Sequence, residues 1–137
     1  MSARMPKRIL LIEDEPDVVK VVVKRLESAG YEVITAGDGV AGLDKVRSDK
    51  PDLVITDLLL PKLDGWRVCH TLKTAHNFQH IPIIVLSGSV LDENPPAGIK
   101  QGDVFMTKPF KPEELLSTVR TLLHEPPPAS PAAPPAG

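Results

Sequence analysis

The sequence contains one cysteine and few aromatic residues, and it has no long apolar run near its N-terminus. The cysteine, Cys69, cannot form an internal disulfide, which favours a reducing compartment. The apolar run that follows the basic N-terminus, residues 9–12, is too short for a signal peptide or a membrane span. A net charge of −2 without a clustered basic stripe argues against a nucleic-acid-binding surface. We therefore predict a cytoplasmic protein that binds neither membranes nor nucleic acid directly.

The chain is long enough for one domain with a buried core, and its composition changes towards the C-terminus. Its 137 residues, 42% hydrophobic and 25% charged, are typical of one globular domain. From Glu125 the sequence reads EPPPASPAAPPAG, and proline at this density prevents a helix or a central strand. We predict a domain over residues 7–125, a disordered N-terminus over residues 1–6, and a disordered tail or linker over residues 126–137.

Short apolar runs alternate with longer segments of helical periodicity through the middle of the chain. The expected strands are Arg8–Ile12, Glu32–Thr35, Leu53–Thr56, Ile83–Leu86 and Val104–Met106. The expected helices are Pro16–Ala29, Gly39–Ser48 (with Val40, Leu43 and Val46 facing inward), Asp64–His76 and Pro112–Leu123. This alternation predicts an α/β fold with a doubly wound, five-stranded parallel sheet. The unit count suits the flavodoxin-like strand order 2-1-3-4-5.

The segment between the fourth and fifth strands does not show a clear helical pattern. It reads VLDENPPAGIKQG and carries Pro95, Pro96 and Gly98, which shorten or break a helix. We predict that this region is irregular or shortened.

Polar residues follow four of the expected strands at the edge where ligands bind in open parallel sheets. These residues are Glu13, Asp14 and Glu15 after the first strand, Asp57 after the third, Ser87 after the fourth and Lys108 after the fifth. The order 2-1-3-4-5 makes those strands neighbours, so the side chains are expected to converge in one cleft. Each residue alone also has an ordinary structural explanation, and for Glu15, beside Pro16, we favour a role at the start of the following helix.

A cluster of carboxylates with one lysine has a definite chemistry. Oxygen ligands suit Mg²⁺, which typically binds one or two carboxylates together with phosphate oxygens. A carboxylate can also act as a nucleophile and form an aspartyl phosphate. Phosphoryl transfer then requires mainly positioning and charge neutralisation, which a metal, a lysine and a hydroxyl supply.

Four segments, ILLIEDEP, PDLVITDLLLPKLDG, IPIIVLSG and TKPF, together resemble the receiver domain of bacterial two-component response regulators, the CheY-like family. The resemblance covers about residues 7–123. It implies that Asp57 is the phosphoacceptor in a two-component phosphorelay. It also implies that Glu13, Asp14, Asp57 and the backbone carbonyl of Leu59 bind Mg²⁺.

The same resemblance implies roles for residues on the last two strands. Ser87 matches the switch hydroxyl, and Lys108 matches the lysine that contacts the phosphoryl group. Phe105 matches the aromatic residue whose rotation accompanies activation, although it also suits simple packing. In this family the bond corresponding to Lys108–Pro109 is typically cis.

The sequence departs from the family pattern at three places. Glu13 stands where the family more often has aspartate, and its longer side chain is expected to reach the metal through water. Ser87 replaces the more common threonine. The segment around residues 95–99 replaces a continuous helix on the usual partner-docking face.

The resemblance implies a signalling protein with at most Mg²⁺-dependent self-phosphorylation and autodephosphorylation. The expected partners are a histidine kinase or phosphotransfer protein and a downstream effector protein, and the expected state is a monomer or weak dimer. The chain suits a complete single-domain regulator or a fragment of a larger regulator with a DNA-binding or enzymatic output domain. A receiver that acts as an interaction module without phosphorylation is a further alternative.

Two other classes of function fit the residues less well. An aspartyl-phosphate phosphatase generally needs a second acid two residues after the nucleophile, where this chain has Leu59. A flavin- or nucleotide-binding module needs a loop after the first strand that accepts phosphate, whereas this loop is acidic. We expect Trp66 to lie near the site and Cys69 to serve packing.

Overall fold

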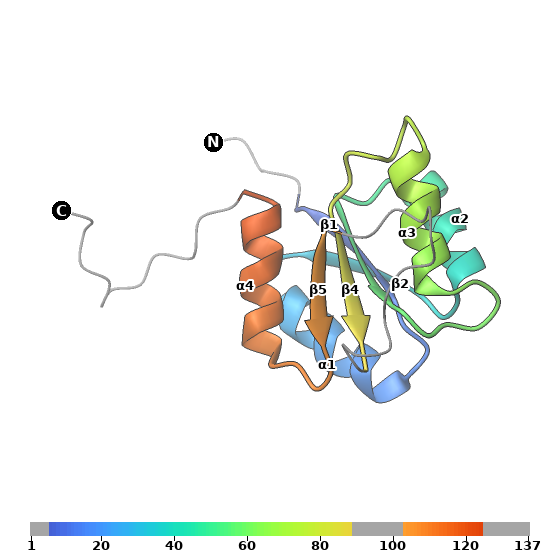
Figure 1. Ribbon diagram of the computed structural model, residues 1–137. Helices are drawn as coiled ribbons and strands as arrows, with labels where there is room; N and C mark the ends of the chain where they lie inside the picture. Colours follow the sequence, from blue (N-terminus) through green and yellow to red (C-terminus); the bar gives the residue numbers. More distant parts are fainter. Residues whose placement is uncertain (1–5, 89–102, 125–137) are drawn as a thin grey trace, which may run out of the picture.

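The computed structural model describes residues 6–88 and 103–124, which form a parallel five-stranded sheet in the order β2-β1-β3-β4-β5 (Figure 1). The strands are β1 (Arg8–Ile12), β2 (Glu32–Ala36), β3 (Leu53–Asp57), β4 (Ile83–Ser87) and β5 (Val104–Thr107). The helices are α1 (Pro16–Ser28), α2 (Gly39–Asp49), α3 (Gly65–Thr74) and α4 (Pro112–Leu122). The predicted flavodoxin-like strand order is confirmed.

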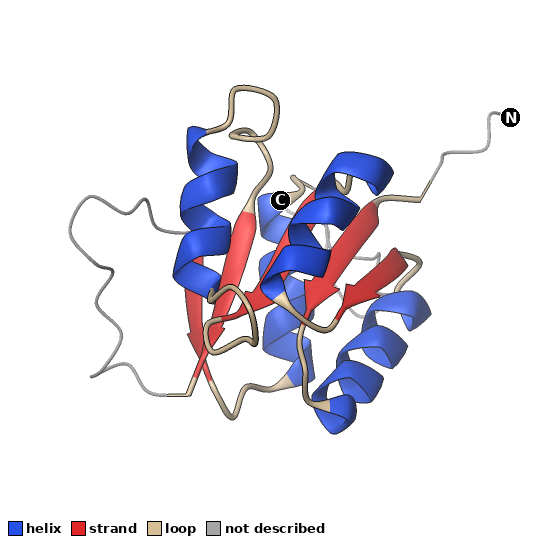
Figure 2. Cartoon of the chain, turned by 90° about the vertical axis from the view of Figure 1, so that its right-hand side faces the viewer, coloured by secondary structure: helices blue, strands red, loops and turns tan. Residues whose placement is uncertain are grey.

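Helices cover both faces of the sheet (Figures 1 and 2). Successive strand residues point to opposite faces, and β1 is buried on both of them. Leu10 and Ile12 belong to the core that α2 and α3 cover. Ile9 and Leu11 belong to the core that α1 and α4 cover. Burial on both faces explains why β1, β3 and β4 are nearly continuous runs of apolar residues.

The observed strands confirm the predicted ones, but four of them extend one residue further. β1 has the predicted bounds. Each of β2 to β5 includes one further residue at its C-terminal end. Asp57 pairs with Leu86, and Ser87 pairs with Thr107. Asp57 and Ser87 are therefore the last residues of strands, not the first residues of loops, and the sheet fixes their backbones.

The helices agree with the predicted segments to within one or two residues at each end, but one inward position is wrong. Val40 was expected to face the core and is instead 47% exposed. The first turns of α2 present Gly39 and Gly42 to the interior, and both are buried. Leu43 and Val46 are buried as predicted. The helical pattern assigned the inward position to the larger apolar residue, Val40. It cannot show where α2 packs so closely against its neighbours that only glycine fits.

Several predictions concern parts of the chain outside the described residues. The irregular segment around residues 95–99, the N-terminus over residues 1–5 and the tail over residues 126–137 all lie there. Residues 6 and 7 are exposed and lead directly into β1. Among the helices within the described ranges, none is long and apolar enough to cross a membrane.

Candidate functional site

Four neighbouring strands end at one edge of the sheet, and each carries a predicted site residue there (Figure 1). Asp57 ends β3 and Ser87 ends β4, while Glu13 follows β1 and Lys108 follows β5. Backbone hydrogen bonds continue beyond the strands. The Glu13 N–H donates to the Ala36 carbonyl (3.0 Å), and the Lys108 N–H donates to the Ser87 carbonyl (2.6 Å). The sheet thus positions the backbones on which the site is built.

Lys108 is bound to three carboxylates at the centre of this edge. Its Nζ donates to Glu13 Oε1 (2.8 Å), Asp57 Oδ2 (3.1 Å) and Glu15 Oε1 (3.2 Å). Burial alone would lower the pKa of Lys108, but the hydrogen bonds and charges of Glu13 and Asp57 outweigh it and raise that pKa above its ordinary value. Lys108 is therefore a permanent cation here. The Lys108–Pro109 bond is cis, as the resemblance implied.

Glu13 and Asp57 are buried although both are acidic. Glu13 is 2% exposed and Asp57 is 6% exposed. The Leu58 N–H donates to Asp57 Oδ1 at 2.8 Å, so both Asp57 oxygens accept hydrogen bonds. Oε2 of Glu13, in contrast, is buried and has no hydrogen-bond partner among the described residues. Burial, together with the adjacent Asp57, raises the pKa of Glu13 to about 7, against the opposite effect of Lys108.

Three acidic side chains form a group that fits a metal ion. Carboxylate oxygens of Glu13, Asp14 and Asp57 lie within 4.8 Å of one another. Asp14 is exposed, so the group opens to solvent on that side. An unpaired buried carboxylate oxygen is costly, and a cation would satisfy the Glu13 oxygen described above. An all-oxygen donor set suits a hard divalent cation such as Mg²⁺.

The family model described as "Response regulator receiver domain" matches residues 9–120 of the chain. The chain belongs to the response regulator receiver family. This match spans the described strands and helices except the first residue of β1 and the end of α4. It includes every residue that the resemblance implicates in the site. The chain is thus a phosphoryl-accepting signalling receiver, and this confirms the predicted family, fold and general function.

Curated relatives share the receiver sequence and are longer. The alkaline phosphatase synthesis transcriptional regulatory protein PhoP of Bacillus subtilis is 38% identical over 130 residues, covering 94% of this chain and 53% of PhoP. The DNA-binding dual master transcriptional regulator RpaA of Synechocystis is 40% identical over 118 residues, covering 85% of this chain and 49% of RpaA. The chain therefore spans about half the length of the curated relatives it matches.

Solved receiver structures superimpose closely on the chain. A putative response regulator from Chloroflexus aurantiacus has a TM-score of 0.79 at 30% identity and covers 88% of this chain and 100% of its own. The receiver domain of the sensor histidine kinase PA1611 from Pseudomonas aeruginosa has a TM-score of 0.79 at 28% identity, with the same coverage. The PA1611 receiver has a magnesium ion coordinated in its active site cleft. The acidic group of the present receiver lies at the ligand-binding edge of the same fold.

Glu15 stands at the start of α1 as predicted, and its side chain has a further contact. We expected it to support the start of α1, and its backbone does stand at the N-cap. Its side chain makes no capping hydrogen bond and instead binds Lys108, 93 residues away. Spacing within the sequence carries no signal for this ion pair. Only the placement of β1 beside β3 and of β5 at the sheet edge brings the two side chains together.

Phe105 on β5 contacts Trp66 on α3. The ring centroids are 5.2 Å apart with an interplanar angle of 47°, and Phe105 is 38% exposed. Trp66 lies near the site as expected, because the Gly65 N–H donates to the Leu58 carbonyl at 2.8 Å, one residue after Asp57. The two aromatic rings therefore link the start of α3 to β5.

Cys69 has no place in the site. It is fully buried on α3, and burial raises the pKa of its thiol to about 12. The thiol stays protonated and packs in the core that α2 and α3 cover.

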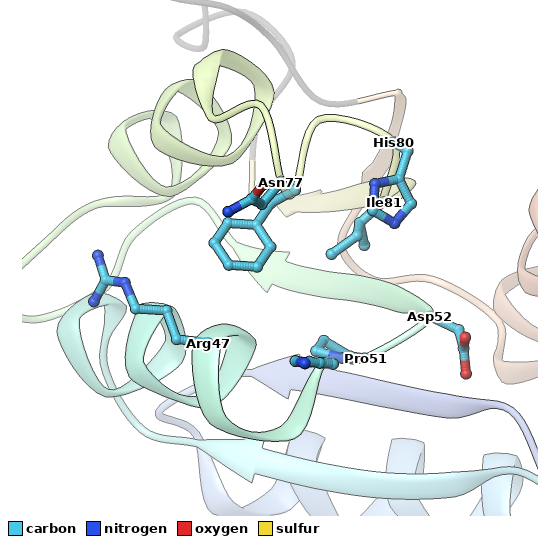
Figure 3. A pocket seen from close by; sticks show the side chains of 8 residues that line it. Arg47, Pro51, Asp52, Asn77, His80 and Ile81 are labelled. Carbon is cyan, nitrogen blue, oxygen red and sulfur yellow. The ribbon is translucent and has the colours of Figure 1, made fainter.

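A separate hollow of about 540 Å³ lies at the opposite end of the receiver (Figure 3). Its lining includes Arg47 and Lys50 at the end of α2, and Asn77, Phe78 and His80 after α3. None of the predicted site residues lines it. Cations at the end of a helix complement its dipole, which explains the basic lining without a ligand.

Replacing Glu13 by glutamine is expected to stabilise the metal-free receiver above pH 7 and to leave its stability unchanged below about pH 4.5. The folded state raises the pKa of Glu13 from 4.5 to about 7, so between these values the unfolded state releases a proton that the folded state retains. The wild type thus loses stability, on the order of 3 kcal/mol, as the pH rises through this window, and the loss persists above it. Urea unfolding with a chelator present, repeated across this pH range, measures the difference.

The control for this comparison is Glu27→Gln, an exposed position on α1. It should leave the unfolding free energy nearly unchanged at every pH. A stability difference for Glu13→Gln that is equally large at pH 4 and pH 8 would contradict the assigned cause.

Proposed function

We propose that this receiver accepts a phosphoryl group on Asp57, in a reaction that requires Mg²⁺, from a histidine kinase or a phosphotransfer protein in the cytoplasm. The observation that supports this most directly is the setting of the Asp57 carboxylate. It ends a buried strand, has one oxygen fixed by the Leu58 N–H, and has the other within 3.1 Å of the Lys108 ammonium. We propose that the receiver works as a monomer or weak dimer.

The transfer forms one bond and breaks one bond. An oxygen of the Asp57 carboxylate attacks phosphorus, while the bond from phosphorus to the nitrogen of the donor histidine breaks and its electron pair stays on the ring. Because the transferred group is anionic, the protein contributes mainly positioning and positive charge. Lys108 supplies a fixed cation beside the attacking carboxylate. Ser87, buried at the end of the adjacent strand β4, supplies a hydroxyl for the phosphoryl oxygens.

Glu13, Asp14, Asp57 and the backbone carbonyl of Leu59 are the proposed ligands for the metal. Bound Mg²⁺ would neutralise charge on the phosphoryl oxygens and on the carboxylates. Without a cation the three carboxylates repel one another, with Lys108 as the one cation among the described side chains that offsets them by direct contact. With the metal bound, two cations would thus offset the negative charge that a phosphoryl group adds at Asp57.

The proposed switch uses Ser87 and Phe105. Phosphorylation adds charge and acceptor oxygens at Asp57, which draws the Ser87 hydroxyl towards the new group. Phe105, two residues before the end of β5 and partly exposed, then changes position against Trp66. The surface over β4 and β5 thereby differs between the two states, and an effector protein distinguishes them.

A hollow of about 460 Å³ beside Lys108 suits contact with the phosphoryl donor. It is lined mainly by apolar atoms, with Val18 and Val21 on α1 and Pro109 and Phe110 after β5. Val21 is 50% exposed. Because Lys108, which contacts Asp57, lines the same hollow, we propose that a donor protein bound at this site covers these apolar side chains.

The output of the receiver is a separate proposal. PhoP and RpaA are described as a transcriptional regulatory protein and a DNA-binding regulator, and the chain matches about half of each. A DNA-binding output domain in the same polypeptide is therefore the form that these relatives favour. Action through an effector protein, or as a phosphorylation-independent interaction module, is the alternative.

Incubation with acetyl phosphate tests the proposed phosphorylation. With Mg²⁺, intact mass spectrometry should show the addition of one phosphoryl group, and a chelator should prevent it. Borohydride reduces an aspartyl phosphate to homoserine, so peptide sequencing then locates the modified residue. We expect position 57. A stable adduct at another residue, or no adduct with Mg²⁺ present, would refute the proposal.

The emission of Trp66 is expected to report metal binding. Trp66 is the only tryptophan in the sequence, and it is adjacent to Gly65, which packs against the Asp57 and Leu58 backbone. Titration with Mg²⁺ should give a saturable change in fluorescence. Asp14→Asn should move the midpoint at least about tenfold higher, because it removes a charged ligand. An unchanged midpoint in that variant would place the metal elsewhere.

A further inference from the structure

We infer that Glu15 competes with the phosphoryl group on Asp57 for Lys108 and thereby weakens the phosphorylated state of the receiver. Glu15 is thus a positioning residue. Its carboxylate determines how many N–H donors of Lys108 are available to the phosphoryl group on Asp57. The inference rests on the proposed phosphorylation of Asp57, and it concerns a carboxylate outside the proposed metal ligands.

The contacts of Lys108 show the competition directly. An ammonium has three N–H donors and no acceptor, and Lys108 has three carboxylate partners at 2.8, 3.1 and 3.2 Å. Two of these partners, Glu13 and Asp57, are the buried members of the acidic group that fits a metal ion. The third, Glu15, draws one donor towards the start of α1. A phosphoryl group on Asp57 needs donors from the same ammonium.

Among the described residues, the Glu15 side chain binds no partner other than Lys108. Its carboxylate does not cap α1 and is not part of the group that fits a metal ion. Its backbone carbonyl accepts from the Val19 N–H at 3.0 Å, and Pro16 begins the helix directly after it. The backbone of Glu15 is thus held within reach of Lys108, while the side chain remains 61% exposed.

Charge acts in the same direction as the hydrogen bond. Glu15 places a negative charge near a site that must receive an anionic group, so it opposes that group both by repulsion and by holding Lys108. Water and salt screen a pair that is exposed on one side, which limits the effect to a few-fold. A few-fold change in the stability of the phosphorylated state is large enough to alter a signalling equilibrium.

The test measures equilibrium binding of beryllium fluoride, a non-hydrolysable mimic of the phosphoryl group, in the presence of saturating Mg²⁺. Isothermal titration calorimetry on the full chain gives the dissociation constant without any enzymatic step. Glu15→Gln keeps the size of the side chain and an acceptor oxygen but removes the charge. We expect it to tighten beryllium fluoride binding about two- to fivefold at low ionic strength, and less at high salt.

Glu27→Gln is the matched control, because it removes an equal charge from the exposed surface of α1, the helix that Glu15 precedes. It should leave the dissociation constant within experimental error. ¹⁵N shifts of the Lys108 ammonium add a readout that a purely structural role would not move, since Glu15→Gln should change its hydrogen bonding in the free receiver.

The outcomes separate this inference from the proposed function. If the wild type binds beryllium fluoride and Glu15→Gln leaves the affinity unchanged or weakens it, Glu15 does not compete for Lys108 and the inference is wrong. If the wild type with Mg²⁺ does not bind beryllium fluoride at Asp57, the proposed phosphorylation fails and the inference fails with it. An equal gain in affinity at low and high salt would also contradict the electrostatic competition.

Discussion

Asp57→Asn is expected to abolish phosphoryl transfer from acetyl phosphate while the fold is retained. An amide nitrogen replaces one carboxylate oxygen, so the variant has neither the charged nucleophile nor the oxygen that accepts from Lys108 at 3.1 Å. The remaining carbonyl oxygen can still accept from the Leu58 N–H, which now bonds Asp57 Oδ1 at 2.8 Å. The side chain therefore keeps its shape and its backbone anchor, and loses the chemistry.

The same variant should lose Mg²⁺ affinity by about tenfold or more, because one of the three carboxylates that lie within 4.8 Å of one another becomes neutral. Intact mass after incubation with acetyl phosphate measures the first effect. The Mg²⁺-dependent change in Trp66 fluorescence measures the second. Circular dichroism establishes that the secondary structure is unchanged.

Asp44→Asn is the control for Asp57→Asn, because it removes a carboxylate outside the site. Asp44 is an exposed residue on α2 that pairs with Arg47 at 3.2 Å, and such pairs contribute little to stability. This variant should gain the phosphoryl group like the wild type. A phosphoryl adduct on Asp57→Asn, stable to the same conditions, would show that another residue is the acceptor.

The sheet could be predicted because its strands are buried on both faces. Ile9–Ile12 and the β3 and β4 segments are apolar at nearly every position, and the helical patterns between them permit only a parallel arrangement with crossover connections. The last residues of the strands could not be predicted in this way. Asp57 and Ser87 are polar, so composition assigned them to loops, whereas the register places them in the ladder.

The proximity of the site residues could also be predicted from the sequence, because the carboxyl ends of neighbouring parallel strands lie together. Their individual roles came from the resemblance to receiver domains. Two features could not be predicted. The burial of Glu13 beside Asp57, which raises its pKa, depends on packing around the strand ends. The ion pair of Glu15 with Lys108 depends on side-chain direction, which no pattern along the chain encodes.

Gly65→Ala is expected to destabilise the receiver by about 2 kcal/mol and to impair phosphorylation as a consequence. A Cβ at Gly65 would lie 2.4 Å from the Asp57 carbonyl oxygen and 2.8 Å from the Leu58 Cα. Both are backbone atoms of the strand end that carries the acceptor, so neither moves without displacing the site. Overpacking of this kind exceeds the gain of about 1 kcal/mol that alanine offers over glycine in a helix.

The matched control is Gly37→Ala. A Cβ at Gly37 would meet nothing within 4 Å, and its backbone does not have the positive φ that favours glycine. Chemical denaturation should therefore show a large loss for Gly65→Ala and a change within about 0.5 kcal/mol for Gly37→Ala. Equal stability of the two variants would mean that α3 shifts to accommodate the methyl group.

The phosphorylation assay on the folded fraction of Gly65→Ala shows whether the close contact of Gly65 with the Asp57 and Leu58 backbone serves only packing or also positions Asp57. The Gly65 N–H donates to the Leu58 carbonyl at 2.8 Å, so α3 begins directly against the residue that follows the acceptor. If the glycine serves only packing, the folded variant accepts the phosphoryl group at the wild-type rate. If it holds the Asp57 backbone in register with Lys108, the rate falls even where the protein remains folded. We expect the second result, because the methyl group would press on the Asp57 carbonyl itself.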